Sequence, residues 1–112
     1  MNIQIYAHKR DFEVQKAERY FKERRIPYQF VDLAKHAMGL KELESVMRQV
    51  GLKDMIVLSD KDWQSHYVSQ LTDIQAALEA LKENPKLLKT PIVRNGKLAT
   101  IGFQPDVWAQ WK

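Results

Sequence analysis

Residues 90–101 have the sequence TPIVRNGKLATI, and this stretch predicts a β-hairpin to which the rest of the fold can be related. Ile92-Val93-Arg94 has the β-branched, apolar character of a strand, and residues 97–101 supply a second strand. Between them, Asn95-Gly96 favours a tight turn, because both residues tolerate the positive φ angles that such turns require. The two strands are therefore expected to run antiparallel.

A strand and a helix are expected at the start of the chain. Residues 3–6 alternate apolar and polar side chains, as a short strand does. Asp11 is suited to cap a helix that ends at residue 23 or 24. Glu18 and Lys22, four residues apart, are expected to pair on the wet side of this helix. Its apolar face comprises Val14, Ala17, Tyr20 and Phe21.

A second strand and a second helix follow. Pro27 prevents easy continuation of the first helix and opens a strand over residues 28–32. Gly51 stands where the end of the next helix needs a left-handed residue. Residues 55–58 are apolar and fit either a buried strand or part of a short helix. The apolar face of the second helix comprises Leu40, Leu43, Met47 and Val50.

Two more helices complete the pattern. A capping box that starts at Thr72 opens a helix that ends at Asn84-Pro85, and Gln104-Pro105 places proline in the first turn of a last helix. The order is β-α-β, a helical middle, then β-β-α. A mixed four-stranded sheet with helices on both faces is the simplest way to bury these apolar surfaces. The chain is therefore predicted to be one α/β domain.

Composition narrows the possible functions. The chain has 112 residues and a net charge of +4, so it is mildly basic, and it contains no cysteine. Disulfides, thiolate metal sites and cysteine nucleophiles are therefore excluded. His36 and His66 have no second ligand at metal spacing, so no metal site is expected. The first ten residues lack the apolar run of a signal peptide, and the longest apolar run, residues 55–58, is far too short to span a membrane. We therefore expect a cytoplasmic protein without membrane contact.

The same layout resembles the thioredoxin-like fold of the arsenate reductase ArsC/Spx family. Thr90-Pro91 before a strand is similar to the cis-proline of that fold. The resemblance covers nearly all of residues 1–112 and implies a single ArsC-type domain without cysteine. The motifs that carry it are Ile5-Tyr6, Lys16-Ala17, Ile26-Pro27-Tyr28, Asn84-Pro85-Lys86-Leu87-Leu88, Thr90-Pro91-Ile92-Val93, Gly96-Lys97 and Gly102-Phe103.

The departures from the family pattern concern its chemistry. Counted from Ile5-Tyr6, the redox cysteine of the family falls on Asp11, and the second cysteine of Spx-like members falls on Val14. The three arginines that hold arsenate in the reductases fall on Ser59, Thr90 and Gln104. The resemblance therefore implies that the thiolate and all three counter-charges are missing together. We expect no arsenate reductase chemistry and no cofactor, and Asp11 is expected to be a structural helix cap.

The loop His8-Lys9-Arg10 has two interpretations. It lies before a helix N-terminus, so it could bind an anion or an acidic surface, with the cis-proline edge Thr90-Pro91 alongside. The other interpretation is a solvated polar loop beside the acidic Asp11. Gly51 also has two interpretations. It is either the end of a helix or, as the resemblance to Spx-like regulators implies, a contact for the C-terminal domain of the RNA polymerase α-subunit.

We therefore predict a non-catalytic protein-binding or regulatory module that uses the loop edge from residue 8 to residue 11. The alternative is a protein that binds a small anion or glutathione, or a thiol-independent enzyme, at the same edge. Direct nucleic-acid contact is not expected, because acidic and basic residues alternate over residues 11–25. Trp63, Trp108 and Trp111 are expected to pack in or around the core.

Overall fold

The sheet is mixed, as predicted, in a computed structural model that describes residues 1–58, 62 and 73–111. Its strands follow the order β2-β1-β3-β4. β1 pairs in parallel with β2, whereas β1–β3 and β3–β4 are antiparallel. The strands are β1 (Ile3–Ala7), β2 (Tyr28–Asp32), β3 (Ile92–Asn95) and β4 (Leu98–Ile101).

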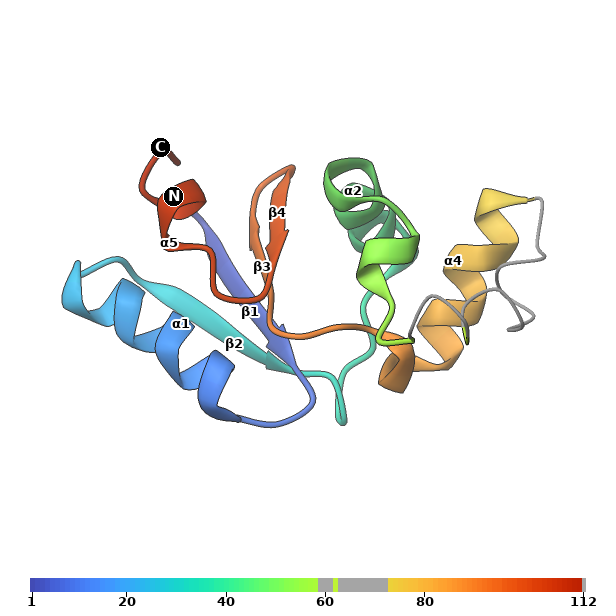
Figure 1. Cartoon of the computed structure of the whole chain (residues 1–112), viewed down its shortest axis with the longest axis horizontal. Coiled ribbons are helices and arrows are strands. Elements are labelled where there is room, and N and C mark those ends of the chain that lie inside the picture. The colour runs from blue at the N-terminus through green and yellow to red at the C-terminus, as the bar shows by residue number, and fades with distance from the viewer. Residues whose placement is uncertain (59–61, 63–72, 112) are drawn as a thin grey trace.

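Helices lie on both faces of this sheet (Figure 1). On one face are α1 (Phe12–Glu23) and the short α5 (Pro105–Trp108), and on the other are α2 (Leu40–Val50) and α4 (Ile74–Glu83). Within the described residues, the 3₁₀ turn η1 (Lys53–Met55) follows α2 and the 3₁₀ turn η3 (Pro85–Leu87) follows α4. No helix within the described residues is long and apolar enough to cross a bilayer.

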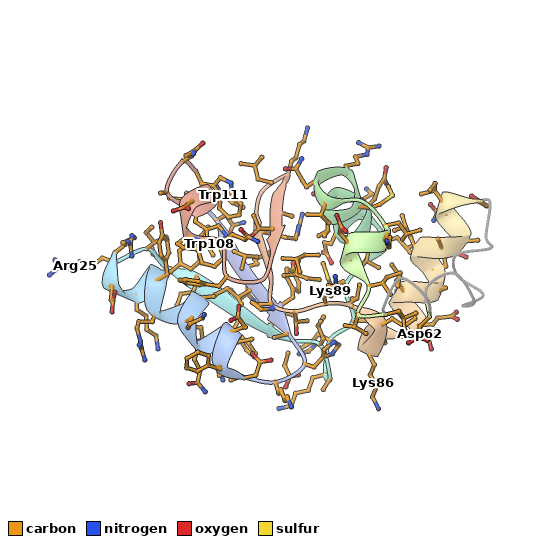
Figure 2. All side chains as sticks on the ribbon, viewed as in Figure 1. Arg25, Asp62, Lys86, Lys89, Trp108 and Trp111 are labelled. Carbon is orange, nitrogen blue, oxygen red and sulfur yellow. The ribbon has the colours of Figure 1, made fainter. Side chains whose placement is uncertain are left out.

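The alternation of side chains along the strands divides the interior into two cores. Ile3, Ile5 and Val93 face α1 and pack with Phe21 and Trp108. On the other face, the core beneath α2 and α4 is built from Tyr6, Leu43, Val46, Leu78, Leu81 and Ile92, among others. Trp108 is buried and Trp111 packs partly buried near it, which confirms the expected role of these two rings (Figure 2). Trp63 lies outside the described residues.

The hairpin turn lies one residue later than its sequence predicts. Asn95 pairs with Leu98 across the ladder, so the two loop residues are Gly96 and Lys97. Gly96 has a φ of 61°, whereas Asn95 remains in the strand with a negative φ. Gly96, at the first loop position, adopts the positive φ that the turn requires there, so Asn95 keeps its strand conformation.

The predicted pair between Glu18 and Lys22 is wrong. Glu18 is only 7% exposed and accepts hydrogen bonds from Arg10 and Tyr28 instead. The apolar face of the helix is confirmed, because Val14, Ala17, Tyr20 and Phe21 are all buried as predicted. A buried carboxylate needs partners that compensate its lost hydration, and the partners here come from a loop and a neighbouring strand rather than from the same helix.

Three local predictions are refined. Asp73 is the N-cap of α4 and its side chain accepts from the Gln75 N–H, while Thr72 lies outside the described residues. Gly51 ends α2 with the expected positive φ of 88°, but its ψ of 151° lies outside the left-handed helical region, in a conformation that glycine alone adopts readily. Of residues 55–58, Met55 ends η1, and the buried Ile56 forms an isolated bridge to Leu88.

Candidate functional site

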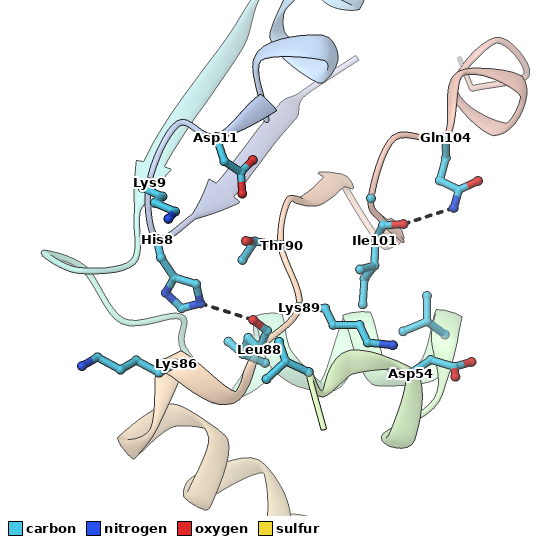
Figure 3. A pocket seen from close by; sticks show the side chains of 13 residues that line it. His8, Lys9, Asp11, Asp54, Lys86, Leu88, Lys89, Thr90, Ile101 and Gln104 are labelled. Carbon is cyan, nitrogen blue, oxygen red and sulfur yellow. Dashed lines mark hydrogen bonds between the residues drawn. The ribbon is translucent and has the colours of Figure 1, made fainter. Parts of the chain in front are cut away.

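A cleft of about 680 Å³ lies at the end of the sheet where β1 finishes and β3 begins (Figure 3). Loops from both halves of the sequence meet there. Because β3 runs antiparallel to β1, the last residue of β1, Ala7, and the first residue of β3, Ile92, lie at the same end of the sheet. The lining residues are His8, Lys9, Asp11, Val50, Asp54, Val57, Lys86, Leu88, Lys89, Thr90, Ile101, Gly102 and Gln104.

Asp11 occupies the N-cap of α1 at the rim of this cleft. Its Oδ1 accepts a hydrogen bond of 3.0 Å from the Val14 N–H, which satisfies one of the free donors of the first helical turn. The negative charge also faces the positive end of the helix dipole. The side chain of Val14 is fully buried in the core between α1 and the sheet and does not line the cleft.

His8 connects the first loop to the segment before β3. Its Nε2 lies 3.2 Å from the carbonyl oxygen of Leu88, and a carbonyl only accepts, so the imidazole donates from Nε2. The Thr90-Pro91 peptide bond two residues later is cis, as predicted. The contact therefore holds the predicted loop beside the predicted cis-proline edge, and both lie at one cleft (Figure 3).

Three lysines surround the cleft, and only one of them was singled out from the sequence. Lys9, Lys86 and Lys89 form no ion pair within the described part of the chain. The described lining contains two carboxylates, Asp11 and Asp54, and the first is engaged as a helix cap. In Figure 3 the side chain of Lys89 extends toward Asp54, whereas that of Lys86 points outward. The cleft is therefore weakly cationic.

Arg10 turns away from the cleft, which divides the predicted basic loop. Its Nε lies 3.0 Å from Glu18 Oε1, and its guanidinium carbon lies 4.0 Å from the centre of the Phe30 ring. The Tyr28 hydroxyl donates to the other carboxylate oxygen of Glu18 at 2.7 Å. Burial, and then the hydrogen bond and negative charge of Glu18, raise the pKa of Tyr28 to about 12.

Two of the three positions assigned to lost arginines lie at the cleft. Thr90 and Gln104 both line it, and both are uncharged. The Gln104 amide donates to the Ile101 carbonyl at 3.1 Å, so it is held against its own loop. Ser59 lies outside the described residues. The cleft takes its positive charge from lysines at other positions. One of them, Lys89, directly precedes Thr90 in the sequence, so it could have been predicted as a cleft residue from that proximity.

Gly51 lies close to the same cleft, although it was predicted as a separate feature. Val50 and Asp54, on either side of it in the sequence, both line the cleft. A Cβ at Gly51 would meet no atom within 4 Å, so its surface faces open space. The structure therefore brings the loop at residues 8–11, the cis-proline edge and the neighbourhood of Gly51 to one part of the molecule.

Comparison with known proteins gives consistent results. The sequence model of the ArsC family matches residues 6–111. The global transcriptional regulator Spx 2 of Oceanobacillus iheyensis is 25% identical, over 100% of this chain and 94% of its own length. Spx of Enterococcus faecalis is 28% identical over 81% of this chain and 71% of its own length.

Solved structures of the same type superpose closely. An ArsC family related protein from Bacteroides fragilis has a TM-score of 0.79 at 22% identity, covering 100% of this chain and 98% of its own. The arsenate reductase of Vibrio cholerae has a TM-score of 0.75 at 23% identity, covering 96% and 94%. These likenesses show that the fold is the thioredoxin-like ArsC fold, as the sequence motifs predicted.

Proposed function

This chain belongs to the ArsC family, and from that premise we propose that it is a non-catalytic member that acts as a protein-binding, regulatory module. The observation that carries the proposal is the carboxylate of Asp11, which stands where the resemblance places the redox cysteine and is engaged with the Val14 N–H. A carboxylate has no reversible sulfur chemistry and is a weak nucleophile toward oxyanions. The regulators among its relatives support a regulatory role.

The partner surface that we propose is the cleft. Lys9 and Lys89 offer cations that form no ion pair within the described residues, and Val57 and Ile101 offer apolar contact beside them. A protein segment that carries acidic side chains beside an apolar one would match both features. Arg10 is excluded from this surface, because it is held by Glu18 on the other side of the loop.

The C-terminal domain of the RNA polymerase α-subunit is the partner that we propose. Gly51 supports this choice, because the resemblance to Spx-like regulators assigns a glycine at this place to that contact. Its open surroundings and its position beside the cleft-lining Val50 and Asp54 would let one partner cover the glycine and the cleft together. In this proposal the loop edge from residue 8 to residue 11 and the contact at Gly51 form one interface.

A second candidate function is supported by the charge of the same cleft. Lys9, Lys86 and Lys89 would also suit a small anion or the carboxylates of glutathione. In that case the ligand would bind to the purified chain without any macromolecular partner.

One set of experiments separates the two candidates. The tagged chain is cross-linked in lysate of its own host, and captured proteins are identified by mass spectrometry. Wild type is compared with Lys9→Gln/Lys89→Gln and with the control Lys35→Gln/Lys82→Gln, which removes the same charge from exposed positions outside the cleft. Capture of the α-subunit that only the cleft variant loses supports the proposal.

The purified chain is then titrated with arsenate, phosphate and glutathione, and assayed for arsenate reduction with a thiol donor. We expect no turnover, because no thiolate is present. Saturable small-anion binding without capture of a partner would favour the second candidate, and turnover by the cysteine-free chain would overturn the non-catalytic proposal.

A further inference from the structure

We propose that the molecule carries a second binding site, for a compact polyanion with phosphate groups, in a groove between α2 and the β3–β4 turn. The groove has a volume of about 570 Å³ and shares no lining residue with the cleft. It lies toward the opposite end of β3, because Arg94 and Lys97 line the groove whereas Thr90 lines the cleft. The proposal therefore stands independently of the proposed function.

The helical side of the groove follows from the period of α2. Lys41, Ser45 and Arg48 are three or four residues apart, so they share one face of the helix. The Ser45 hydroxyl donates to the Lys97 carbonyl at 3.1 Å and fixes this face against the hairpin turn. Basic side chains from segments about fifty residues apart are thereby brought around one hollow.

Arg94 supplies a fixed positive charge to the groove. Its Nη1 donates to Gln4 Oε1 at 3.1 Å and to the Tyr6 hydroxyl at 3.2 Å, and its Nη2 donates to the Gly96 carbonyl at 3.1 Å. Its Nε is buried and has no hydrogen-bond partner. All these acceptors are neutral, and within the described chain no carboxylate pairs with Arg94. A partly buried cation without a counter-ion is costly, and a bound anion would relieve that cost.

The rim adds further uncompensated charge. Lys41 and Lys97 are exposed and form no ion pair among the residues described. Arg48 pairs with Glu44, which is the only carboxylate among the described residues of the lining. Four cations thus face one carboxylate, and the groove keeps three net positive charges.

The chemistry of the lining favours phosphate over an acidic peptide. Among the residues that the structure describes, no apolar side chain lines the groove, so the hydrophobic anchors of a peptide would find no pocket there. Lysine and arginine only donate hydrogen bonds, and phosphate oxygens only accept them. The volume is within the range of small-ligand sites. Free polyphosphate and the phosphates of a nucleotide share this chemistry.

The test uses the full chain at low ionic strength, with sodium tripolyphosphate and ATP as probes, and amide chemical shifts with calorimetry as readouts. We expect saturable shifts at residues 41–49 and 94–97. Lys41→Gln/Lys97→Gln should weaken tripolyphosphate binding about tenfold or more, because two charge-assisted contacts are lost. The control Lys35→Gln/Lys82→Gln removes equal charge from exposed positions outside the groove and should leave binding within about twofold of wild type.

Two further comparisons make the result specific. Lys9→Gln/Lys89→Gln should leave tripolyphosphate binding to the groove unchanged, which separates this site from the cleft. ATP that binds as tightly as tripolyphosphate, with shifts at the same amides, assigns the site to nucleotides, and much weaker ATP binding assigns it to polyphosphate. Equal weakening in the control variant, shifts confined to the cleft, or tighter binding of an oligo-glutamate peptide would overturn the proposal.

Discussion

The Nε of Arg10 lies 3.0 Å from Oε1 of Glu18, a carboxylate only 7% exposed inside a helix that otherwise has a regular amphipathic pattern. The Tyr28 hydroxyl contacts the second oxygen of the same carboxylate, and the Phe30 ring lies beneath the guanidinium. Glu18 thereby ties the first loop and α1 to the edge strand β2. This contact decides which cations remain for the cleft, because it removes Arg10 and leaves Lys9.

Glu18→Gln is expected to lower the free energy of unfolding by about 1 kcal/mol. The substitution weakens two hydrogen bonds to a charged carboxylate, which are stronger than neutral ones, but solvent screens the half-exposed Arg10 and limits the loss. Urea denaturation measures the change. The matched control is Glu13→Gln, which removes an exposed pair to Lys16 and should cost no more than about 0.5 kcal/mol. Equal losses for the two variants would contradict the special role of Glu18.

Tyr28 is expected to titrate at about pH 12 in the folded chain, against 10.0 for an ordinary tyrosine. The unfolded chain then releases this proton first, so the contribution of Tyr28 to stability is intact below pH 10 and is lost as pH rises toward 12. Glu18→Gln should lower the pKa, because it removes a negative charge beside the phenol. A ring-carbon NMR titration measures both values, and an unshifted Tyr28 in the variant would refute the assignment.

Asp11→Ala is expected to destabilise the fold by about 1 kcal/mol, whereas Asp11→Ser should cost only a few tenths, because serine can also accept from the Val14 N–H. Thermal and urea unfolding of the three proteins test this order. An alanine variant as stable as wild type would show that the carboxylate is free for another role.

Gly51→Ala is expected to cost about 1 kcal/mol or more, since a φ of 88° with a ψ of 151° is a conformation that only glycine adopts readily. Gly51→Arg should cost the same, because the space around a Cβ there is open. The pair of variants therefore separates backbone strain, which both share, from side-chain bulk, which only arginine adds. A much less stable arginine variant would indicate a steric clash that the structure does not contain.

The order of strands and helices could be predicted because each element has a local signal. The apolar face of α1 and the cap at Asp11 follow from neighbouring residues, and both are confirmed. The cis-proline at Thr90-Pro91 is what the family resemblance implies, and it is confirmed too. The partners of Glu18 could not be found in this way. Arg10 and Tyr28 approach it only after α1 has packed on the sheet.

The candidate site shows the same limit. Lys9 and Thr90 were recognised from sequence, but Lys86 and Asp54 join them only through tertiary packing. The position of the hairpin turn was predicted wrongly for a different reason. Both Asn95-Gly96 and Gly96-Lys97 can form a tight turn, and the register of β3 against β4 decides between them. Local patterns therefore determine the elements, while packing selects their partners.

The most direct test of the proposed interface is an NMR titration of the isotope-labelled chain with the purified C-terminal domain of its host's RNA polymerase α-subunit. We predict saturable amide shifts at residues 8–11, 50–54 and 88–90, retained in Gly51→Ala and abolished in Gly51→Arg. Amides at these positions that stay unchanged at saturating concentration, or an arginine variant that binds as wild type does, would contradict it.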